Sequence, residues 1–469
     1  MRLPFLLSLG LGLLGCGTSK DDPLPATDAG FPDSGPSDLG VADLGSADSG
    51  RAEDCELTIE VPTIAVGATV IITLGGNFEA GQIVGDQPEG WRAAFINQRD
   101  LQIKAPYTVG PSPTPLLINY SCGGFVEQRE VPLEARALAF TPLAPWTPGA
   151  TGPLAREYFS MWVDPLAPDR LWLYGGFHYV PRQFTTGHDV WSLNLVNEAW
   201  TAHADGPERG LPGAGVARLP DGRVYRYGGL NFNAIPNERD TPFVLHRVDT
   251  STAGLNFTEP SVRGPAYGDY HPSFFHHPRT NKLYAVCGLN DQVGAHCDVS
   301  AYDPVAETFS AVTVTGPAPI GRNGHFWAYD EPTDRLIVFS GEGYPGTNNC
   351  RNCQQDTWAL ELGATPFRWV QLTVSGAPVG RRNGAYVLDP LHHRLFVWGG
   401  TPDGRNSAPG LWALDLTPGQ EAWHEVPTTG DVRVRTSGAA VYDGARRRLL
   451  FGFGNNPTPL ADLWALALD

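Results

Sequence analysis

Short apolar runs, separated by polar turns, recur through the C-terminal two thirds of the chain. In the clearest stretch, residues 384–389 and 394–398 are rich in Tyr, Val, Leu, Phe and Trp and are bounded by turn residues, which predicts two strands. Trp412–Leu416 and Trp423–Val426 predict a third and a fourth. Because four antiparallel strands of this pattern have two apolar faces, one such sheet cannot bury itself alone and must stack on copies.

The same unit is repeated six times. Residues 322–369 repeat the order of 382–423, and the glycine that ends the second apolar run returns roughly every 55 residues, the length of one propeller blade. These glycines are Gly176, Gly229, Gly288, Gly341, Gly400 and Gly454. Radial stacking of such sheets predicts a β-propeller.

Three features that recur among the units indicate which kind of propeller this is. They are paired glycines (Gly175–Gly176, Gly228–Gly229 and Gly399–Gly400), an Asp-x-Trp strand such as the one that follows Gly175–Gly176, and a Trp or Phe seven residues before a Gly-x-x-x-x-Arg stretch. This order resembles the kelch pattern. The resemblance implies an all-β fold, a six-bladed kelch-type propeller over residues 136–469. It implies no particular function, because a propeller is a scaffold for many activities.

The last repeat ends directly after its third strand, in ADLWALALD, so its outer strand is missing. Upstream, Trp146 is followed by Gly152, Pro153 and Arg156, the order that normally follows a fourth strand. We therefore expect residues near 138–148 to supply the fourth strand of blade six and to close the ring without an exposed edge.

Residues 55–135 carry no propeller repeat. Alternating apolar positions in ELTIEVPTIAVGATVIITLGGNF, LQIKAPY and PLLINYSCGG predict short strands separated by Gly and Pro. This stretch resembles an immunoglobulin-like domain of the IPT/TIG type, in which a turn such as Gly75–Phe78 is common. We expect a small β-sandwich that acts as a spacer or a secondary binding module.

The N-terminus predicts export and lipid anchoring. Residues 1–15 form a short apolar run after one basic residue, as in a signal peptide, and Leu13-Leu14-Gly15-Cys16 resembles a bacterial lipobox. This resemblance implies cleavage before Cys16 and lipid on its thiol, with Gly17 favouring the outer membrane. Residues 16–54 are rich in Asp, Gly, Ser and Pro, which predicts a disordered linker between membrane and folded part.

Seven cysteines are present, and six remain if Cys16 carries lipid. In an exported protein disulfides are expected, so we predict that the six pair with one another. A four-cysteine zinc site and a redox-active Cys-Arg-Asn-Cys pair are the alternatives for the last four. The predicted disulfide pairs are Cys55 with Cys122, Cys287 with Cys297 and Cys350 with Cys353.

Loop lengths indicate which propeller face binds ligands. Loops between strands two and three are long and varied, whereas turns between strands one and two are short, such as DEPTDR and DPLHHR. The histidine pairs His276–His277 and His392–His393 fall in short turns, where we expect solvated residues rather than metal ligands. We call the face with the long loops and the lead-in to strand one the loop face, and the opposite one the turn face.

Arginines at the lead-in to strand one are the candidate binding residues. Gathered at one mouth of the channel, their guanidiniums would favour a carboxylate or an acidic peptide. The alternative is that each ties adjacent blades by bonding backbone carbonyls. The predicted ligand-binding set is Arg156, Tyr270, His271, Arg322, His325, Arg382 and Arg435.

We find no zinc-protease, nucleophile-elbow or phosphate-loop motif in the sequence. We therefore expect a membrane-anchored, monomeric lipoprotein that binds an envelope or extracellular protein or glycan, with no catalysis, metal or cofactor. Resemblance to kelch enzymes leaves a copper oxidase or a sugar-acid epimerase as alternatives. The net charge of −17 and the absence of a basic stripe argue against nucleic acid as a partner.

Overall fold

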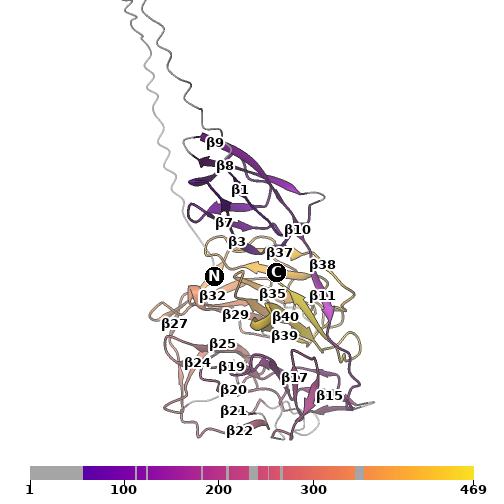
Figure 1. Cartoon of the computed structure of the whole chain (residues 1–469). Helices are drawn as coiled ribbons and strands as arrows, with labels where there is room; N and C mark the ends of the chain where they lie inside the picture. The colour runs from indigo at the N-terminus through magenta and orange to yellow at the C-terminus, as the bar shows by residue number, and fades with distance from the viewer. Residues whose placement is uncertain are drawn as a thin grey trace, which may run out of the picture. The chain divides into compact units, whose positions relative to one another are not determined.

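The computed structural model describes residues 56–110, 113–122, 125–180, 183–207, 211–231, 241–251, 253–264, 268–343 and 353–468. Within these ranges the chain is built almost entirely of β-strands (Figure 1). The described residues belong to one compact unit that begins at Ala52. No helix among them is long and apolar enough to cross a bilayer.

The first described part, residues 57–136, is a small β module. Two three-stranded sheets, in the orders β3-β7-β6 and β5-β8-β9, contribute to one hydrophobic cluster. Alternate residues face that cluster, so Leu101 and Ile103 of one sheet and Ile118 and Val131 of the other are fully buried. The immunoglobulin-like classification of this module stays a prediction. Its strands are β1 (Leu57–Thr58), β2 (Ile64–Ala65), β3 (Thr69–Thr73), β4 (Gly75–Gly76), β5 (Ala80–Ile83), β6 (Arg92–Phe95), β7 (Asp100–Lys104), β8 (Thr114–Cys122), β9 (Phe125–Leu133) and β10 (Ala135–Arg136).

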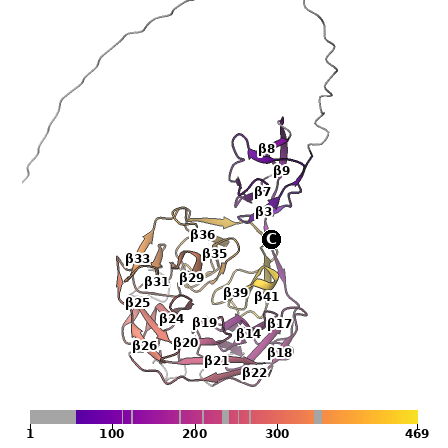
Figure 2. The same cartoon turned by 60° about the vertical axis from the view of Figure 1, so that its left-hand side comes forward.

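Six antiparallel sheets follow one another in a ring over the rest of the described chain (Figure 2). Blades one to three are β13 (Ser160–Val163), β14 (Arg170–Tyr174), β17 (Val190–Asn194) and β18 (Trp200–Ala202); β19 (Gly215–Arg218), β20 (Val224–Tyr227), β21 (Leu245–Ser251) and β22 (Gly254–Thr258); and β23 (Ser273–His277), β24 (Lys282–Asn290), β25 (Gly294–Asp303) and β26 (Thr308–Ala311). Blades four to six are β29 (Phe326–Asp330), β30 (Arg335–Phe339), β32 (Thr357–Glu361) and β33 (Phe367–Leu372); β34 (Ala385–Asp389), β35 (Arg394–Trp398), β36 (Leu411–Asp415) and β37 (Ala422–Val426); and β39 (Ala439–Asp443), β40 (Arg448–Gly452), β41 (Leu463–Ala467) and β11 (Leu138–Pro142).

Shorter strands and two 3-10 turns connect these sheets. They are β12 (Arg156–Glu157), β15 (Phe177–Val180), β16 (Gln183–Thr186), β27 (Val314–Thr315), β28 (Arg322–Asn323), β31 (Glu342–Gly343), β38 (Thr428–Thr429), η2 (Glu331–Thr333) and η3 (Gly444–Arg446).

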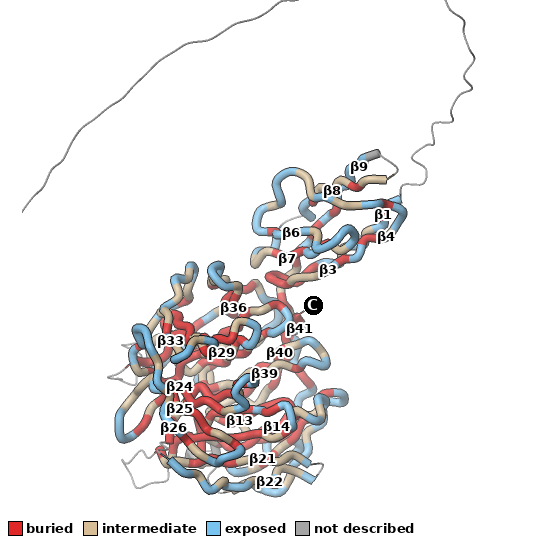
Figure 3. The backbone as a smooth tube through the Cα atoms, turned by 90° about the vertical axis from the view of Figure 1, so that its left-hand side faces the viewer, coloured by how far each residue is buried: buried red, intermediate tan, exposed pale blue. Residues whose placement is uncertain are grey.

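Burial within a blade explains the apolar runs in the sequence. Every residue of β30 and of β35 is buried, because the second strand is covered by the neighbouring blade on each face. Figure 3 shows the buried residues in red, gathered inside the propeller. The first strand, as in β29, alternates buried and partly exposed residues, because it lines the central channel. The aromatic side chains Trp172, Trp369 and Trp398 are buried between blades.

The strand missing from the last repeat is supplied by β11. Phe140, Thr141 and Pro142 pair with Leu466, Ala465 and Trp464 of β41 in antiparallel register. Phe140 is buried against Trp398 and Phe451, at ring-centroid distances of 5.4 and 5.6 Å. An N-terminal strand therefore completes blade six, as the truncated repeat predicts.

The short turns on the turn face are built on ion pairs. Asp389, at the end of β34, accepts a hydrogen bond of 2.9 Å from Arg394 at the start of β35, and both side chains are fully buried. Contrary to expectation, two turn histidines are not simply solvated. His277 contacts Asp334 of the next blade at 2.8 Å, and His393 contacts Asp330 of the preceding blade at 2.6 Å.

Candidate functional site

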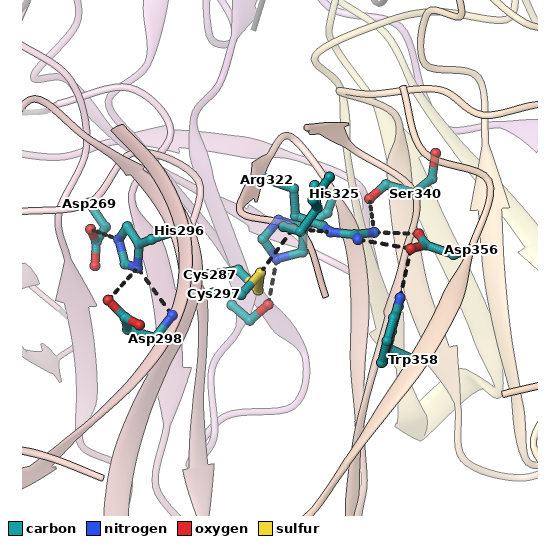
Figure 4. Close-up of a disulfide and its surroundings, with 12 residues drawn as sticks. Asp269, Cys287, His296, Cys297, Asp298, Arg322, His325, Ser340, Asp356 and Trp358 are labelled. Atoms are coloured by element: carbon teal, nitrogen blue, oxygen red, sulfur yellow. Dashed lines mark hydrogen bonds and ion pairs between the residues drawn. A yellow bond between two sulfur atoms is a disulfide. The ribbon is translucent and has the colours of Figure 1, made fainter. Parts of the chain in front are cut away.

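The repeated arginine, aspartate and tryptophan of the kelch pattern form one buried cluster in each blade that contains all three. In blade four the Arg322 guanidinium donates to both carboxylate oxygens of Asp356, at 2.6 and 3.0 Å, and to the Ser340 carbonyl at 3.0 Å (Figure 4). The Trp358 indole donates to the same carboxylate at 2.7 Å. Burial would raise the pKa of Asp356, but hydrogen bonds from Arg322 and its charge lower it, so the carboxylate stays ionised.

Blades one and six repeat this cluster. Arg156 is paired with Asp189 and bonds the Gly175 carbonyl, and Trp191 donates to Asp189 at 2.7 Å. In blade six the corresponding residues are Arg435, Asp462, Phe453 and Trp464.

This geometry corrects the expected ring of four arginines at the channel mouth. Arg156, Arg322 and Arg435 are 0% exposed, and their guanidiniums are hydrogen-bonded within their own blades. A side chain with no exposed surface does not contact a ligand in the channel. The three arginines therefore hold the lead-in to strand one against the rest of the same blade, instead of tying adjacent blades together.

In blade five the structural arginine is Arg381, one residue before the predicted Arg382. Arg381 donates to the Val379 and Gly399 carbonyls, at 3.0 and 3.3 Å. The position of the aspartate is taken by Gly410, so burial lowers the pKa of Arg381 to about 10. Arg382, the next residue, does not take this position, and its guanidinium is instead bonded to Glu342.

Blade three keeps the aspartate position but lacks the arginine. Asp298 stands where blade four has Asp356, whereas Asp269 occupies the position of the arginine. His296 of β25, two residues before Asp298, contacts Asp269 at 2.8 Å (Figure 4). Burial lowers the pKa of His296, but the hydrogen bond to Asp269 and the charge of Asp269 outweigh this and raise it. A histidine thus links the lead-in to strand one with the third strand in this blade.

A ring of backbone hydrogen bonds closes the channel beneath the loop face. Two positions after the arginine position, every blade has a residue with positive φ, between 54° and 71°. The N–H of this positive-φ residue donates to the carbonyl of the equivalent residue in the preceding blade. In the described chain this hydrogen bond is present at five of the six junctions between blades, at 2.7 to 3.2 Å. We call these six residues the αL ring: Tyr158, Gly213, His271, Gly324, Asn383 and Ser437.

Side chains of the αL ring fill its centre. The Asn383 amide donates to the Tyr158 hydroxyl at 3.1 Å, and the rings of Tyr158 and His271 lie 5.0 Å apart. A Cβ added to Gly213 would lie 2.3 Å from Tyr270, so this position has no room for a side chain. The channel is therefore blocked at this level.

On the loop face of the αL ring, the structure brings together three of the predicted residues. The Tyr270 and His271 rings are stacked at 3.8 Å. The Arg382 guanidinium donates to the buried carboxylate of Glu342 at 2.6 Å, and its charge affects the pKa of His271. We call Tyr270, His271, Arg382 and Glu342 the mouth cluster.

The mouth cluster carries little net positive charge. Burial, with a smaller contribution from Arg382, lowers the pKa of His271 to about 3. Burial likewise lowers the pKa of His325 to about 3, and His325 lies behind the mouth, bonded to Ser273 at 2.7 Å. Both imidazoles are neutral at pH 7, and Glu342 balances Arg382. An acidic peptide is thus a poorer fit than a neutral polar ligand.

One of the three expected cysteine pairs is confirmed. Cys287 and Cys297 form a disulfide (Figure 4). Cys122 and Cys353 are each disulfide-bonded, but the partners predicted for them lie outside the described residues. Cys16, Cys55 and Cys350 lie outside the described residues. Within the described ranges, no group of three or more His, Cys, Asp and Glu side chains is placed to hold a metal ion.

Sequence reasoning missed several residues of this site. Glu342, which follows the glycine after β30, belongs to blade four, and its partner Arg382 belongs to blade five. The sequence does not show that these two residues meet. Tyr158 occupies a left-handed position that its residue type does not signal, whereas Asn at position 383 is a type enriched there. The strand register Ala385↔Trp398 shows that Arg381 and not Arg382 is the structural arginine. The sequence carries a signal for this, because Gly376 to Arg381 is the Gly-x-x-x-x-Arg stretch of that repeat.

Comparison with known proteins supports the fold. The kelch-repeat domain family described as KLHDC2/KLHL20/DRC7 matches residues 271–469. The chain is 27% identical over 213 residues to the Rab9 effector protein with kelch motifs of Bos taurus, covering 45% of this chain and 52% of that protein. It is 25% identical over 183 residues to the serine/threonine-protein phosphatase BSL2 of Arabidopsis thaliana, covering 37% and 16%.

The chain thus spans about half or less of these relatives. Among solved structures, that of YjhT has a TM-score of 0.49 and 16% identity, and the match covers 68% of this chain and 95% of that one. The family match and the six four-stranded blades in the described chain together identify the fold as a kelch-type β-propeller.

Proposed function

We propose that this protein is an exported, lipid-anchored binding protein whose propeller holds a protein or glycan on its loop face without catalysis. The observation that carries the proposal is the mouth cluster. It presents a stacked Tyr270–His271 pair beside a charge-balanced Arg382, on a ring of blades fixed by backbone hydrogen bonds. Such a rigid surface loses little entropy when a ligand binds.

The chemistry of the mouth cluster indicates the kind of ligand. An aromatic face packs against the apolar face of a sugar ring or against a peptide side chain. Arg382 supplies further N–H donors at the edge of the same surface. Ligand hydroxyls or backbone carbonyls would accept these bonds, so the proposed ligand is polar and largely uncharged.

An array experiment tests this proposal. The full chain, purified in detergent, is applied to an array of glycans and to an array of 12-residue peptides. We expect binding on at least one array, and Tyr270→Ala is expected to weaken it at least tenfold. Val305→Ala removes an exposed apolar side chain from the opposite side of the same blade and is expected to leave binding unchanged. Binding that survives Tyr270→Ala would contradict the assignment of the site.

The anchoring part of the proposal is independent of the ligand. It rests on the lipobox ending at Cys16 and on the acidic linker that follows it. In a bacterium grown with an alkyne-tagged fatty acid, the full chain is expected to incorporate the tag and to fractionate with the envelope. Cys16→Ser is expected to lose the tag. Equal labelling of both forms would rule out Cys16 as the attachment site.

A further inference from the structure

Beneath the αL ring lies a cavity that shares one residue, His271, with the mouth cluster. Its volume is about 700 Å³, which is in the range of small-molecule sites, and it is lined by the first strands of the blades. The αL ring forms its inner end. Its outer end is lined by turn-face residues that include Pro165, Pro220, Pro278 and Pro390, most of them exposed.

One layer of the cavity wall contains an arginine. The fourth residue of each first strand lies at the same level, since all six strands begin in the same register. In blade one this residue, Val163, is buried in the core and does not line the cavity. The other five line it: Arg218, His276, Tyr329, Leu388 and Tyr442. Four blades thus present an apolar, aromatic or imidazole side chain at this level, and blade two presents a guanidinium.

Arg218 has no carboxylate partner in the described chain. Its guanidinium makes a single hydrogen bond there, to the Val163 carbonyl at a long 3.5 Å. Arg218 lies deep within the ring of blades, and the loss of hydration there lowers its pKa, an effect that no acid of the described chain offsets. Its surface is still accessible to solvent, because the side chain lines the cavity. This contrasts with Arg156, Arg322 and Arg435, each paired with an aspartate.

The wall of the neighbouring and opposite blades is aromatic. The rings of Phe275 and Tyr329 are stacked at 5.0 Å, and those of Trp327 and Tyr386 lie 5.9 Å apart. All four residues line the cavity. The Tyr329 hydroxyl is already bonded to Asp334 at 3.1 Å, so this tyrosine offers its ring face and not its hydroxyl. In a ring of six blades, Tyr386 of blade five lies opposite Arg218 of blade two.

We propose that this cavity is a second binding site, specific for a small aromatic carboxylate. The carboxylate accepts two hydrogen bonds from Arg218, whose planar guanidinium matches its geometry. The ring packs against the aromatic wall across the channel. A sugar acid fits less well, because its hydroxyls need more hydrogen-bonding partners than this wall supplies.

Calorimetric titration of the full chain with 1-naphthoate tests the proposal. We expect saturable binding, at least tenfold weaker binding of the uncharged 1-naphthamide, and at least tenfold weaker binding of glucuronate. Arg218→Met is expected to weaken naphthoate binding at least tenfold, and Arg218→Lys less. Arg263→Met, which removes an exposed arginine outside the cavity lining, is the matched control and is expected to bind like the native chain.

A second variant tests the cavity independently of the charge. Leu388→Trp fills the space opposite Arg218 and is expected to abolish naphthoate binding while leaving binding to the glycan and peptide arrays intact. The site is overturned if naphthoate releases no heat, or binds Arg218→Met and the native chain equally. Tighter binding of glucuronate than of naphthoate would overturn the ligand class. The naphthoate and glucuronate outcomes do not depend on the loop-face proposal, which is tested by Tyr270→Ala; only the array control for Leu388→Trp does.

Discussion

At the scale of single residues, arginines of this propeller differ in the partners that lie within reach. Arg322 is paired with Asp356, and its charge is used to join two segments of one blade. Arg381 lacks an aspartate but is bonded to two carbonyls. Among the described residues, Arg218 has one carbonyl at 3.5 Å, and it lines the cavity. The residue type is the same in all three cases, so partner geometry distinguishes the structural arginines from the one proposed to bind a ligand.

Replacing Arg322 and Arg381 by methionine compares a paired with an unpaired structural arginine. Arg322→Met leaves Asp356 as a partly buried carboxylate without its cation, so we expect a loss of about 3 kcal/mol in unfolding free energy. Arg381→Met removes hydrogen bonds to two carbonyls but strands no carboxylate, so the expected loss is about 1–2 kcal/mol. Urea denaturation measures both, and equal losses would contradict the role given to the aspartate.

Neutral His325 predicts acid sensitivity. Its pKa is about 3 in the folded protein and about 6.5 when unfolded. The unfolded chain therefore takes up the proton first, and stability present above pH 6.5 is lost as the pH falls toward 3. Between pH 7 and pH 5 this amounts to about 2 kcal/mol.

We expect His325→Gln to remove this part of the loss, as measured by urea denaturation at the two pH values. Ser273→Ala removes the hydrogen-bond partner of His325 but keeps the imidazole, so it is expected to retain the pH dependence. An unchanged pH dependence in His325→Gln would show that the imidazole is protonated, or not buried, in the folded state.

At the scale of elements, the sequence predicts strands better than the places where they meet. The second strands, such as Arg394–Trp398, are continuous apolar runs, and the missing fourth strand is evident from the truncated last repeat. The αL ring leaves little signal, because its positions hold several residue types and two of them, Tyr158 and Ser437, have no intrinsic preference for positive φ. They adopt it because their N–H groups bond neighbouring blades, a condition that exists only in the assembled ring.

The disulfide between Cys287 and Cys297 holds the loop between the second and third strands of blade three. The two cysteines are 10 positions apart in the sequence. On a loop-closure basis, the double replacement Cys287→Ala, Cys297→Ala is expected to lower the unfolding free energy by about 2–3 kcal/mol. A thermal melt compares the two forms, and a midpoint unchanged by the replacement would show that packing around Cys287 holds the loop without the bond.

At the scale of the whole molecule, the propeller is one cooperative ring, because β11 joins its first and last segments. Phe140→Ala leaves a cavity between Trp398 and Phe451, so we expect a loss of about 3–4 kcal/mol and a single shifted unfolding transition. Thr141→Ala, at the exposed neighbouring position of the same strand, is expected to cost less than about 1 kcal/mol. Separate transitions for blade six and the others would contradict a single cooperative ring.

The position of β11 in the chain also determines when blade six can be completed during synthesis. Among the described strands of the propeller, β11 is synthesised first and its partner β41 (Leu463–Ala467) last. Until β41 has been synthesised, the edge of β11 that pairs with it stays without its hydrogen-bonding partner. A chain that stops before residue 463 lacks β41, so the edge of β11 stays unpaired. Incomplete copies therefore expose a strand edge that complete copies do not, and a protease or chaperone that binds strand edges can distinguish the two.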